Sequence, residues 1–308
     1  MPFWSVEAAT LVLVAASSCA QTPSASSPAA AALSGEKAME HVRAQVALGP
    51  RPPGSDALAR ARQYIVAQLR GWGYAVEDDT FEPVTPYGPK KMHDLIARRE
   101  GRASDRGAIV LATHYDTKYF PSGNFVGAND PGSSTALALE LARVLAGSRD
   151  GLDYWFVFFD GEEAFIEWSS FDSTYGSRHL ARRWKQEGVT AKIRAFILLD
   201  MIGDRDLELN RESNSTRWLR DLVWSTAAEI GLSGILGSTE GAIEDDHVPF
   251  LDAGVACVDL IDLNYGPPGN SYHHRDTDTL DKVSAESMEK VGKLVLAVLP
   301  KLQKKFGK

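Results

Sequence analysis

Chemically reactive side chains follow three apolar segments of strand length, at the point where each segment ends. AIVLAT leads into His114 and Asp116, WFVFF is followed by Glu162 and Glu163, and AFILL leads into Asp200. In open α/β sheets, ligands bind at the carboxyl ends of the strands, so we expect these side chains to meet in one crevice. Imidazole and carboxylate groups gathered in a crevice can bind a metal ion or transfer protons.

Two loops carry further candidates. The turn-rich loop GANDPGSS carries Asp130 and opens a helical segment, and a loop near the C-terminus carries His273 and His274. Glu162 and Glu163 precede an Ala-Phe pair and follow a strand, so both carboxylates enter a partly buried place at a desolvation cost. A cation or a role in proton transfer would offset that cost. The residues that together supply the imidazole and carboxylate ligands preferred by catalytic zinc are His114, Asp130, Glu163, Asp200 and His274.

Composition and missing motifs exclude several other classes of protein. The 308 residues include 33 basic and 41 acidic side chains, a net charge of −8 that argues against a nucleic-acid binder. Two cysteines exclude a disulfide scaffold, and Cys257 lies in an apolar run that suits a buried small hydrophobe rather than a reactive thiolate. No GxSxG elbow, P-loop, GxGxxG or HExxH motif occurs, and no apolar run is long enough to span a membrane.

Alternating helical and strand-like segments must position these side chains. Apolar residues recur at helical spacing in 36–48, 55–70, 133–146, 177–187, 215–230 and 284–303, and strand-length apolar runs occupy 94–98, 108–113, 154–160, 195–200 and 255–261. Unbroken runs such as WFVFF suit strands that are covered on both faces. We therefore expect a three-layer α/β/α architecture with a central mixed, mostly parallel sheet, in a single catalytic domain over residues 36–308.

Residues 1–35 are typical of an export signal followed by a tether. An apolar segment, Ala8–Ala16, precedes the small-residue sequence Ala-Ser-Ser-Cys19 and then a stretch rich in Ser, Ala and Pro. Ala-Ser-Ser-Cys is close to a bacterial lipobox, in which the cysteine becomes the lipidated first residue. The segment therefore predicts either a periplasmic protein released by ordinary cleavage or a lipoprotein anchored to the membrane at Cys19.

The same strand ends and loops resemble a known family. The segments THYDTK, GANDPGSST, FFDGEEAFIEWSSFDSTYGSRHLA, LLDMIGD and IEDDHVPFLDAGV are similar to the zinc aminopeptidase superfamily, and most of all to its glutaminyl cyclases. A further familiar piece is the turn GPRPPGS near residue 50. The similarity extends over nearly all of residues 36–308. It implies a zinc-aminopeptidase-like fold and an acyltransferase that converts N-terminal Gln of peptides or proteins to pyroglutamate with release of ammonia.

The resemblance also implies a role for each matching residue. One zinc ion would be bound by Asp130, Glu163 and His274. Glu162 would be the general acid/base, Asp200 and Asp245 would form a hydrogen-bonded carboxylate pair, and Trp168 would line the substrate pocket. Cyclases commonly have Trp immediately before the histidine ligand, whereas this chain has His273, so the pocket wall differs here. A compact single domain makes a monomer the expected state.

Two other functions use the same inventory of residues. In a di-zinc aminopeptidase, His114 and Asp200 would bind a second metal, Asp130 would bridge the two ions and Glu162 would activate water. His114 and Asp116 thus have two possible roles: they could help to bind a second metal, or they could form a structural hydrogen-bonded pair beside a single metal. An inactive, peptidase-like binding protein should have lost a ligand or the general base, and this chain retains them all.

Overall fold

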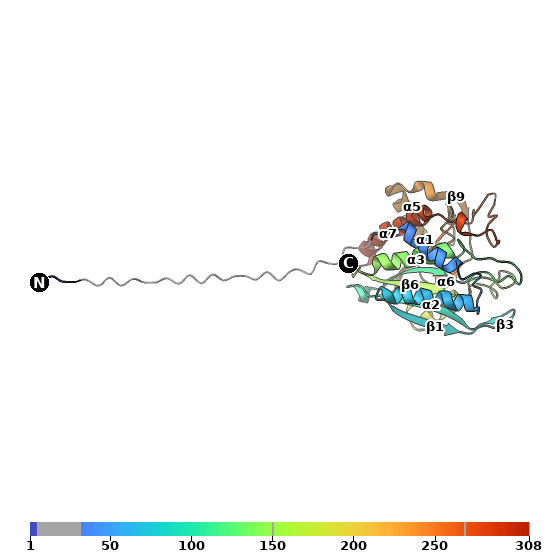
Figure 1. Ribbon diagram of the computed structural model, residues 1–308, viewed down its shortest axis with the longest axis horizontal. Helices are drawn as coiled ribbons and strands as arrows, with labels where there is room; N and C mark the ends of the chain where they lie inside the picture. Colours follow the sequence, from blue (N-terminus) through green and yellow to red (C-terminus); the bar gives the residue numbers. More distant parts are fainter. Residues whose placement is uncertain (5–31, 150, 268, 308) are drawn as a thin grey trace.

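A six-stranded mixed sheet forms the centre of the protein in a computed structural model that describes residues 1–4, 32–149, 151–267 and 269–307 (Figure 1). Its order is β1 (Ala75–Phe81), β4 (Met92–Arg99), β6 (Asp153–Phe159), β5 (Ala108–His114), β7 (Ile193–Asp200) and β10 (Cys257–Ile261). β4 pairs antiparallel with β1 and β6, whereas β6, β5, β7 and β10 run parallel to one another. The predicted mixed, mostly parallel sheet is confirmed.

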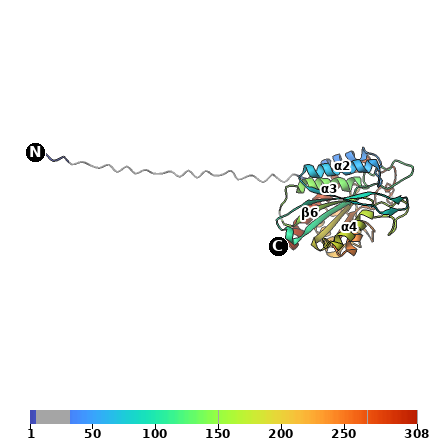
Figure 2. The same ribbon diagram turned by 90° about the horizontal axis from the view of Figure 1, so that it is seen from below.

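Helices cover both faces of this sheet. One face packs against α1 (Gly35–Val46), α2 (Asp56–Gly71), α3 (Gly132–Leu145), α5 (Arg217–Glu229) and α7 (Ala285–Phe306). The other packs against α4 (Tyr175–Gln186) and the short α6 (Val248–Asp252). Figure 2 shows α2 and α3 on the side of the sheet opposite α4, which gives the three predicted layers.

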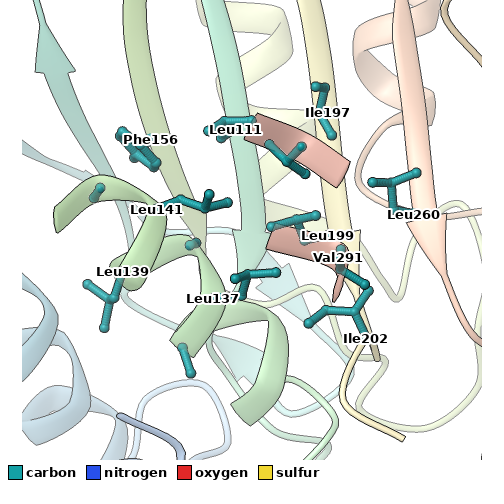
Figure 3. Close-up of a cluster of buried hydrophobic side chains, with 14 of the residues drawn as sticks. Leu111, Leu137, Leu139, Leu141, Phe156, Ile197, Leu199, Ile202, Leu260 and Val291 are labelled. Atoms are coloured by element: carbon teal, nitrogen blue, oxygen red, sulfur yellow. The ribbon is translucent and has the colours of Figure 1, made fainter. Parts of the chain in front are cut away.

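The alternation of side chains along the buried strands divides the core between the two faces. On β7, Ile197 and Leu199 join the larger apolar cluster, whereas Phe196 and Leu198 join the cluster beneath α4 and α6. Figure 3 shows the larger cluster, with Leu141 of α3 near the strands that carry Leu111 and Ile197. Both faces are apolar, so the sequence shows continuous apolar runs at these strands.

Serine caps explain where several helices begin. The hydroxyl oxygen of Ser55 accepts a hydrogen bond from the Leu58 backbone N–H at 3.1 Å, and Ser284 accepts one from the Ser287 N–H at 3.3 Å. These bonds satisfy N–H groups that have no partner inside the first helical turn. The helices α2 and α7, which are capped in this way, start within one residue of the starts expected from the sequence.

Several elements carry no apolar run and escaped the sequence analysis. β1 is an edge strand with the polar sequence AVEDDTF, so it lacks the buried pattern used to find its neighbours. The other missed elements are the five-residue helix α6, β2 (Val84–Thr85), β3 (Gly88–Pro89), β8 (Leu209–Glu212), β9 (Leu236–Gly241), and the short 3₁₀ turns η1 (Ser104–Arg106), η2 (Thr190–Lys192), η3 (Ser233–Ile235) and η4 (Leu280–Lys282). Leu209 of β8 and Ile235 of η3 join the larger core cluster, but as single residues rather than as part of an apolar run.

The structure describes one of the two cysteines. Cys257 is a free, fully buried thiol at the start of β10, as its apolar surroundings in the sequence predict. Cys19 and most of the proposed export signal lie outside the described residues. Among the described helices, none combines the length and the apolar character that crossing a membrane requires.

Candidate metal centre and active site

The parallel strands bring the predicted polar residues to one edge of the sheet. His114 is the last residue of β5 and pairs in register with Phe159, the last residue of β6, just before the segment that carries Glu162 and Glu163. Asp200 ends β7, the next strand on the other side of β5. The carboxyl ends of these three strands therefore place an imidazole and several carboxylates side by side, as expected from the strand-end rule.

His114 lies at the centre of this cluster. Its Nε2 atom is 3.3 Å from Oδ1 of Asp130 and 3.3 Å from Oδ1 of Asp200. Its Nδ1 atom is 3.6 Å from Asp116 Oδ1 and 3.8 Å from Glu162 Oε2. Burial lowers the pKa of His114, but the surrounding carboxylates raise it well above its usual value, so the imidazolium form is favoured here.

The three residues expected to bind zinc meet through His274. Its Nε2 atom is 2.9 Å from Glu163 Oε1 and 3.2 Å from Asp130 Oδ2. Burial lowers the pKa of His274, yet these carboxylates raise it to about 10. Asp130 Oδ2 and both Glu163 carboxylate oxygens are buried without a hydrogen-bond partner among the described residues. Buried, unpartnered oxygens beside an imidazole nitrogen fit a bound cation, and one nitrogen with carboxylate oxygens suits zinc.

The loop that carries Asp130 is held by two buried side chains. Asp278 accepts hydrogen bonds from the backbone N–H groups of Asn129 at 2.8 Å and Asp130 at 3.1 Å. Arg51, from the GPRPPGS turn, is fully buried and donates to the carbonyl of Val126 at 2.8 Å. The turn that looked familiar in the sequence therefore fixes the backbone ahead of the proposed metal ligand.

Asp116 fixes the paired glutamates from the other side. Its carboxylate accepts hydrogen bonds from the backbone N–H groups of Glu162 at 3.1 Å and Glu163 at 3.3 Å. This is a supporting position, one of the two roles left open for Asp116. Burial raises the pKa of Glu162 well above its usual value, the nearby His114 lowers it, and Glu163 and Asp245 raise it. A carboxyl group balanced in this way is suited to accepting and returning a proton.

A cavity of about 510 Å³ opens onto this cluster. Its walls include the predicted residues Asp130, Glu162, Trp168, Asp200, Asp245, His273 and His274. Burial raises the pKa of Asp200 and, together with repulsion from Asp200, raises that of Asp245 well above its usual value. The electrostatics favour a proton on at least one of these two acids, and their direct pairing stays a prediction.

His273 lies directly beside Asp130 and His274, two of the residues expected to bind zinc. Its Nε2 atom is 3.6 Å from Asp130 Oδ2, and its ring centroid is 3.6 Å from that of His274. Burial and the neighbouring His274 lower the pKa of His273 to about 4, which keeps the ring neutral. Ligand atoms of Asp130, His273 and His274 lie within 4.8 Å of one another, and those of His114, Asp130 and Asp200 form a second such group.

Some residues of the site carried no usable signal in the sequence. Lys118 lies in the cavity wall, with its Nζ atom 3.7 Å from Glu163 Oε2. Asp245 of the cavity wall also forms a third buried group with His247 and Asp259, whose ligand atoms lie within 4.8 Å of one another. Asp259 lies in the middle of an apolar strand, so only its position within a buried run could have drawn attention to it.

Comparisons with known proteins first define the class. A family model described as Peptidase family M28 matches residues 94–299, which include every proposed metal ligand and Glu162. The matched region also includes the central strands from β5 to β10 and the first helical turns of α7. Fold and site therefore agree with this class of protein.

More specific relatives are glutaminyl-peptide cyclotransferases. The protein of that name from Drosophila melanogaster is 34% identical over 242 residues, covering 70% of this chain and 68% of its own length. The Bos taurus protein is 34% identical over 279 residues, covering 78% of this chain and 76% of its own length. The crystal structure of an Acidobacteriales bacterium glutaminyl cyclase superposes with a TM-score of 0.85 and 42% identity, covering 93% of this chain and 99% of that one. The chain belongs to the glutaminyl-peptide cyclotransferase family of M28-type proteins.

Proposed function

We propose that this protein converts N-terminal glutamine of peptides or proteins to pyroglutamate and releases ammonia. The observation that carries the proposal is one cavity lined by Asp130, His274, Glu162 and Trp168, with Glu163 against His274. Metal-binding groups, a buried general base and an aromatic wall thus surround a space large enough for one side chain. The family to which the chain belongs supports the same activity.

The reaction joins two parts of the same residue. The α-amine nitrogen attacks the γ-amide carbon, a new C–N bond closes the five-membered ring, and the bond to the amide nitrogen breaks. Glu162 takes a proton from the attacking amine and returns it to the departing nitrogen, which leaves as ammonia. Zinc held by Asp130, Glu163 and His274 would polarise the γ-carbonyl and stabilise the negative charge that develops on its oxygen.

The chain's own groups supply orientation and charge balance. Trp168 lines the cavity and offers an apolar surface against which the folded glutamine side chain can be held, so that amine and carbonyl meet. A protonated Asp245 can donate a hydrogen bond to a polar atom of the substrate, and Asp200 beside it interacts with His114. Asp116 keeps Glu162 in place through the backbone.

A di-zinc aminopeptidase is the second candidate because the ligand atoms of His114, Asp130 and Asp200 form a group within 4.8 Å. Such a group could bind a second metal that shares Asp130 with the first. The glutaminyl-peptide cyclotransferase relatives favour the cyclase function. The number of zinc ions per chain distinguishes the two functions. We expect about one zinc ion per active chain, whereas about two would favour the peptidase.

A product assay tests the proposed function. Purified protein loaded with zinc is incubated with a Gln-initiated peptide, and ammonia and the peptide mass are followed. The proposal expects ammonia and a peptide that is lighter by one ammonia, with its N-terminus blocked. Free glutamine as the main product would contradict the proposed cyclisation and would favour the aminopeptidase function.

A further inference from the structure

Helix α4 carries three basic side chains on one face. Arg178, Arg182 and Lys185 are spaced four and three residues apart, so they lie along a single stripe of the helix. None of the three forms an ion pair with a carboxylate in the part of the chain that the structure describes. By contrast, Arg183 on a different face pairs with both Glu77 and Asp79. The stripe therefore gathers three basic side chains outside any ion pair, on a chain whose net charge is −8, although Asp172 and Asp246 lie close enough to Arg178 to raise its pKa against the lowering by burial.

This stripe lines a second cavity, of about 410 Å³, beside the catalytic one. The two cavities share Trp168, Glu244 and Asp245 as walls, so they adjoin one another. Arg178 is fixed there because its guanidinium donates hydrogen bonds to the backbone carbonyls of Ser170 and Ser173, in the loop that follows Trp168. Arg182 and Lys185 are exposed, and Lys185 donates a hydrogen bond to the backbone carbonyl of Asp252 at 3.3 Å rather than to a carboxylate, so both charges can still reach a ligand.

A third cavity, of about 520 Å³, extends the same path. It shares Arg178 and Arg182 with the second cavity, and its other walls include Phe81, Val84 and Phe171. Val84 is 77% exposed and Phe171 is 83% exposed, an unusual placement for apolar side chains of this size. A groove therefore leads away from the catalytic cavity, with Arg178, Arg182 and Lys185 and apolar side chains along its walls and with Asp252 and Glu82 as further acidic residues beside them.

We propose that this groove binds the residues of the substrate that follow its N-terminal glutamine and selects chains with an acidic side chain there. The inference rests on the proposed function, because it places glutamine in the cavity with Glu162. A peptide leaving that cavity passes Trp168 and Glu244 first and then meets the basic stripe. Glu244 is exposed at the shared wall, so an acidic residue directly after glutamine gains nothing, whereas one further along pairs with Arg182 or Lys185.

The test uses the zinc-loaded protein and hexapeptide amides that begin with Gln. The remaining residues are Ala, except for a single Asp or Lys placed at each position from the second to the sixth. At low ionic strength we expect kcat/KM for Asp at the third position or later to exceed that for Lys about threefold to tenfold. The difference should shrink in about 0.5 M salt and should be absent at the second position.

Variants assign the effect to the stripe. The double variant Arg182→Ala, Lys185→Ala should lose the preference for Asp and retain wild-type kcat/KM on glutaminyl-alanine amide, which is too short to reach the groove. Lys37→Ala with Lys192→Ala removes the same charge from exposed positions elsewhere and should keep the preference.

Three outcomes would overturn the inference. Equal kcat/KM for the Asp and Lys series would show that the groove does not select charge. An undiminished preference in the double variant would place the selection elsewhere on the protein. Failure to cyclise any of the peptides, glutaminyl-alanine amide included, would remove the proposed function and the inference with it, whereas the first two outcomes leave the proposed function standing.

Discussion

Glu162 is the residue on which the proposed chemistry depends most directly. It is buried beside His114, whose Nδ1 atom is 3.8 Å from its carboxylate, and Asp116 fixes its backbone. Burial favours the protonated form of the carboxyl group and the neighbouring imidazolium favours the ionised form. A single carboxyl group held between these two influences can pass a proton in either direction during one turnover.

We expect Glu162→Gln to lower kcat for cyclisation by about 10²- to 10⁴-fold, because the amide cannot accept the amine proton. The substitution keeps the shape of the side chain, so zinc content and the far-ultraviolet circular dichroism spectrum should match those of the wild type. Glu167→Gln changes an exposed carboxylate five residues away and should leave kcat nearly unchanged. A Glu162→Gln variant with full activity would exclude this residue as the acid/base.

The residues proposed to bind zinc come from three separate parts of the chain. Asp130 precedes α3, Glu163 follows β6 and His274 lies in the loop before α7. Replacing His274 by Ala removes the nitrogen that lies against both carboxylates, so we expect the bound zinc to fall from about one per chain to near zero, measured by metal analysis after dialysis. Retention of a full equivalent would point to His273 as the nitrogen ligand, since it is also close to Asp130.

At the scale of elements, the short strand β8 is connected to the active site through its last residue. Glu212 accepts hydrogen bonds from the backbone N–H groups of Asn214 at 2.7 Å and Ile243 at 3.0 Å, and its Oε2 atom is 3.3 Å from His247 Nε2. One carboxylate thus ties the turn before α5 to the segment that leads into Asp245. Burial raises the pKa of Glu212, but these hydrogen bonds lower it to about 2.

This pKa predicts how the stability of the protein depends on pH. The folded value lies below the usual value near 4.5, so the contribution of Glu212 is complete above about 4.5 and is lost as the pH falls toward 2. We expect Glu212→Gln to lower the free energy of unfolding by about 1–3 kcal/mol at pH 6, with a smaller difference at pH 3. Urea unfolding of both proteins at the two pH values measures it, and a pH-independent difference would contradict the assignment.

At the scale of the whole molecule, the described fold begins close to the end of the proposed tether. The backbone N–H of Ser34 donates to Glu140 at 2.7 Å and that of Gly35 donates to Glu289 at 3.1 Å, so the packed structure starts here. We propose that residues 1–35 export the protein and tether it, with Cys19 as an anchor if the segment is read as a lipobox. We also propose that the catalytic domain acts as a monomer.

A chain that starts at Ala32 should therefore fold and cyclise a Gln peptide with wild-type kcat/KM, since it retains α1 and the backbone hydrogen bonds from Ser34 and Gly35. A chain that starts at Ala47 lacks α1, which packs on α3 and α7 through Ala38 and Val42, and should be unfolded at 25 °C. Activity assays and thermal denaturation compare the two chains. Loss of activity in the chain that starts at Ala32 would show that the first 31 residues contribute to catalysis.

Much of the fold followed from local patterns. Apolar runs identified β5, β6 and β7 because a strand covered on both faces must be apolar throughout, and polar residues after each run indicated the catalytic edge. β1 was not found because an edge strand needs no such pattern. β8 is only four residues long, and the six residues of β9 are mostly exposed and carry no apolar run. The nature of the site was therefore easier to predict than the outline of the sheet.

The sequence by itself determined the residue types of the site, its place at the strand ends and the order of the main elements. Only the tertiary structure decided that Asp116 holds the backbone of both glutamates, that His273 lies against Asp130, and that the cavity beside the basic stripe of α4 shares walls with the cavity of Glu162. The reason is physical. Periodicity and strand ends are set by neighbours along the chain, whereas these contacts join residues from elements that meet only when the helices pack onto the sheet.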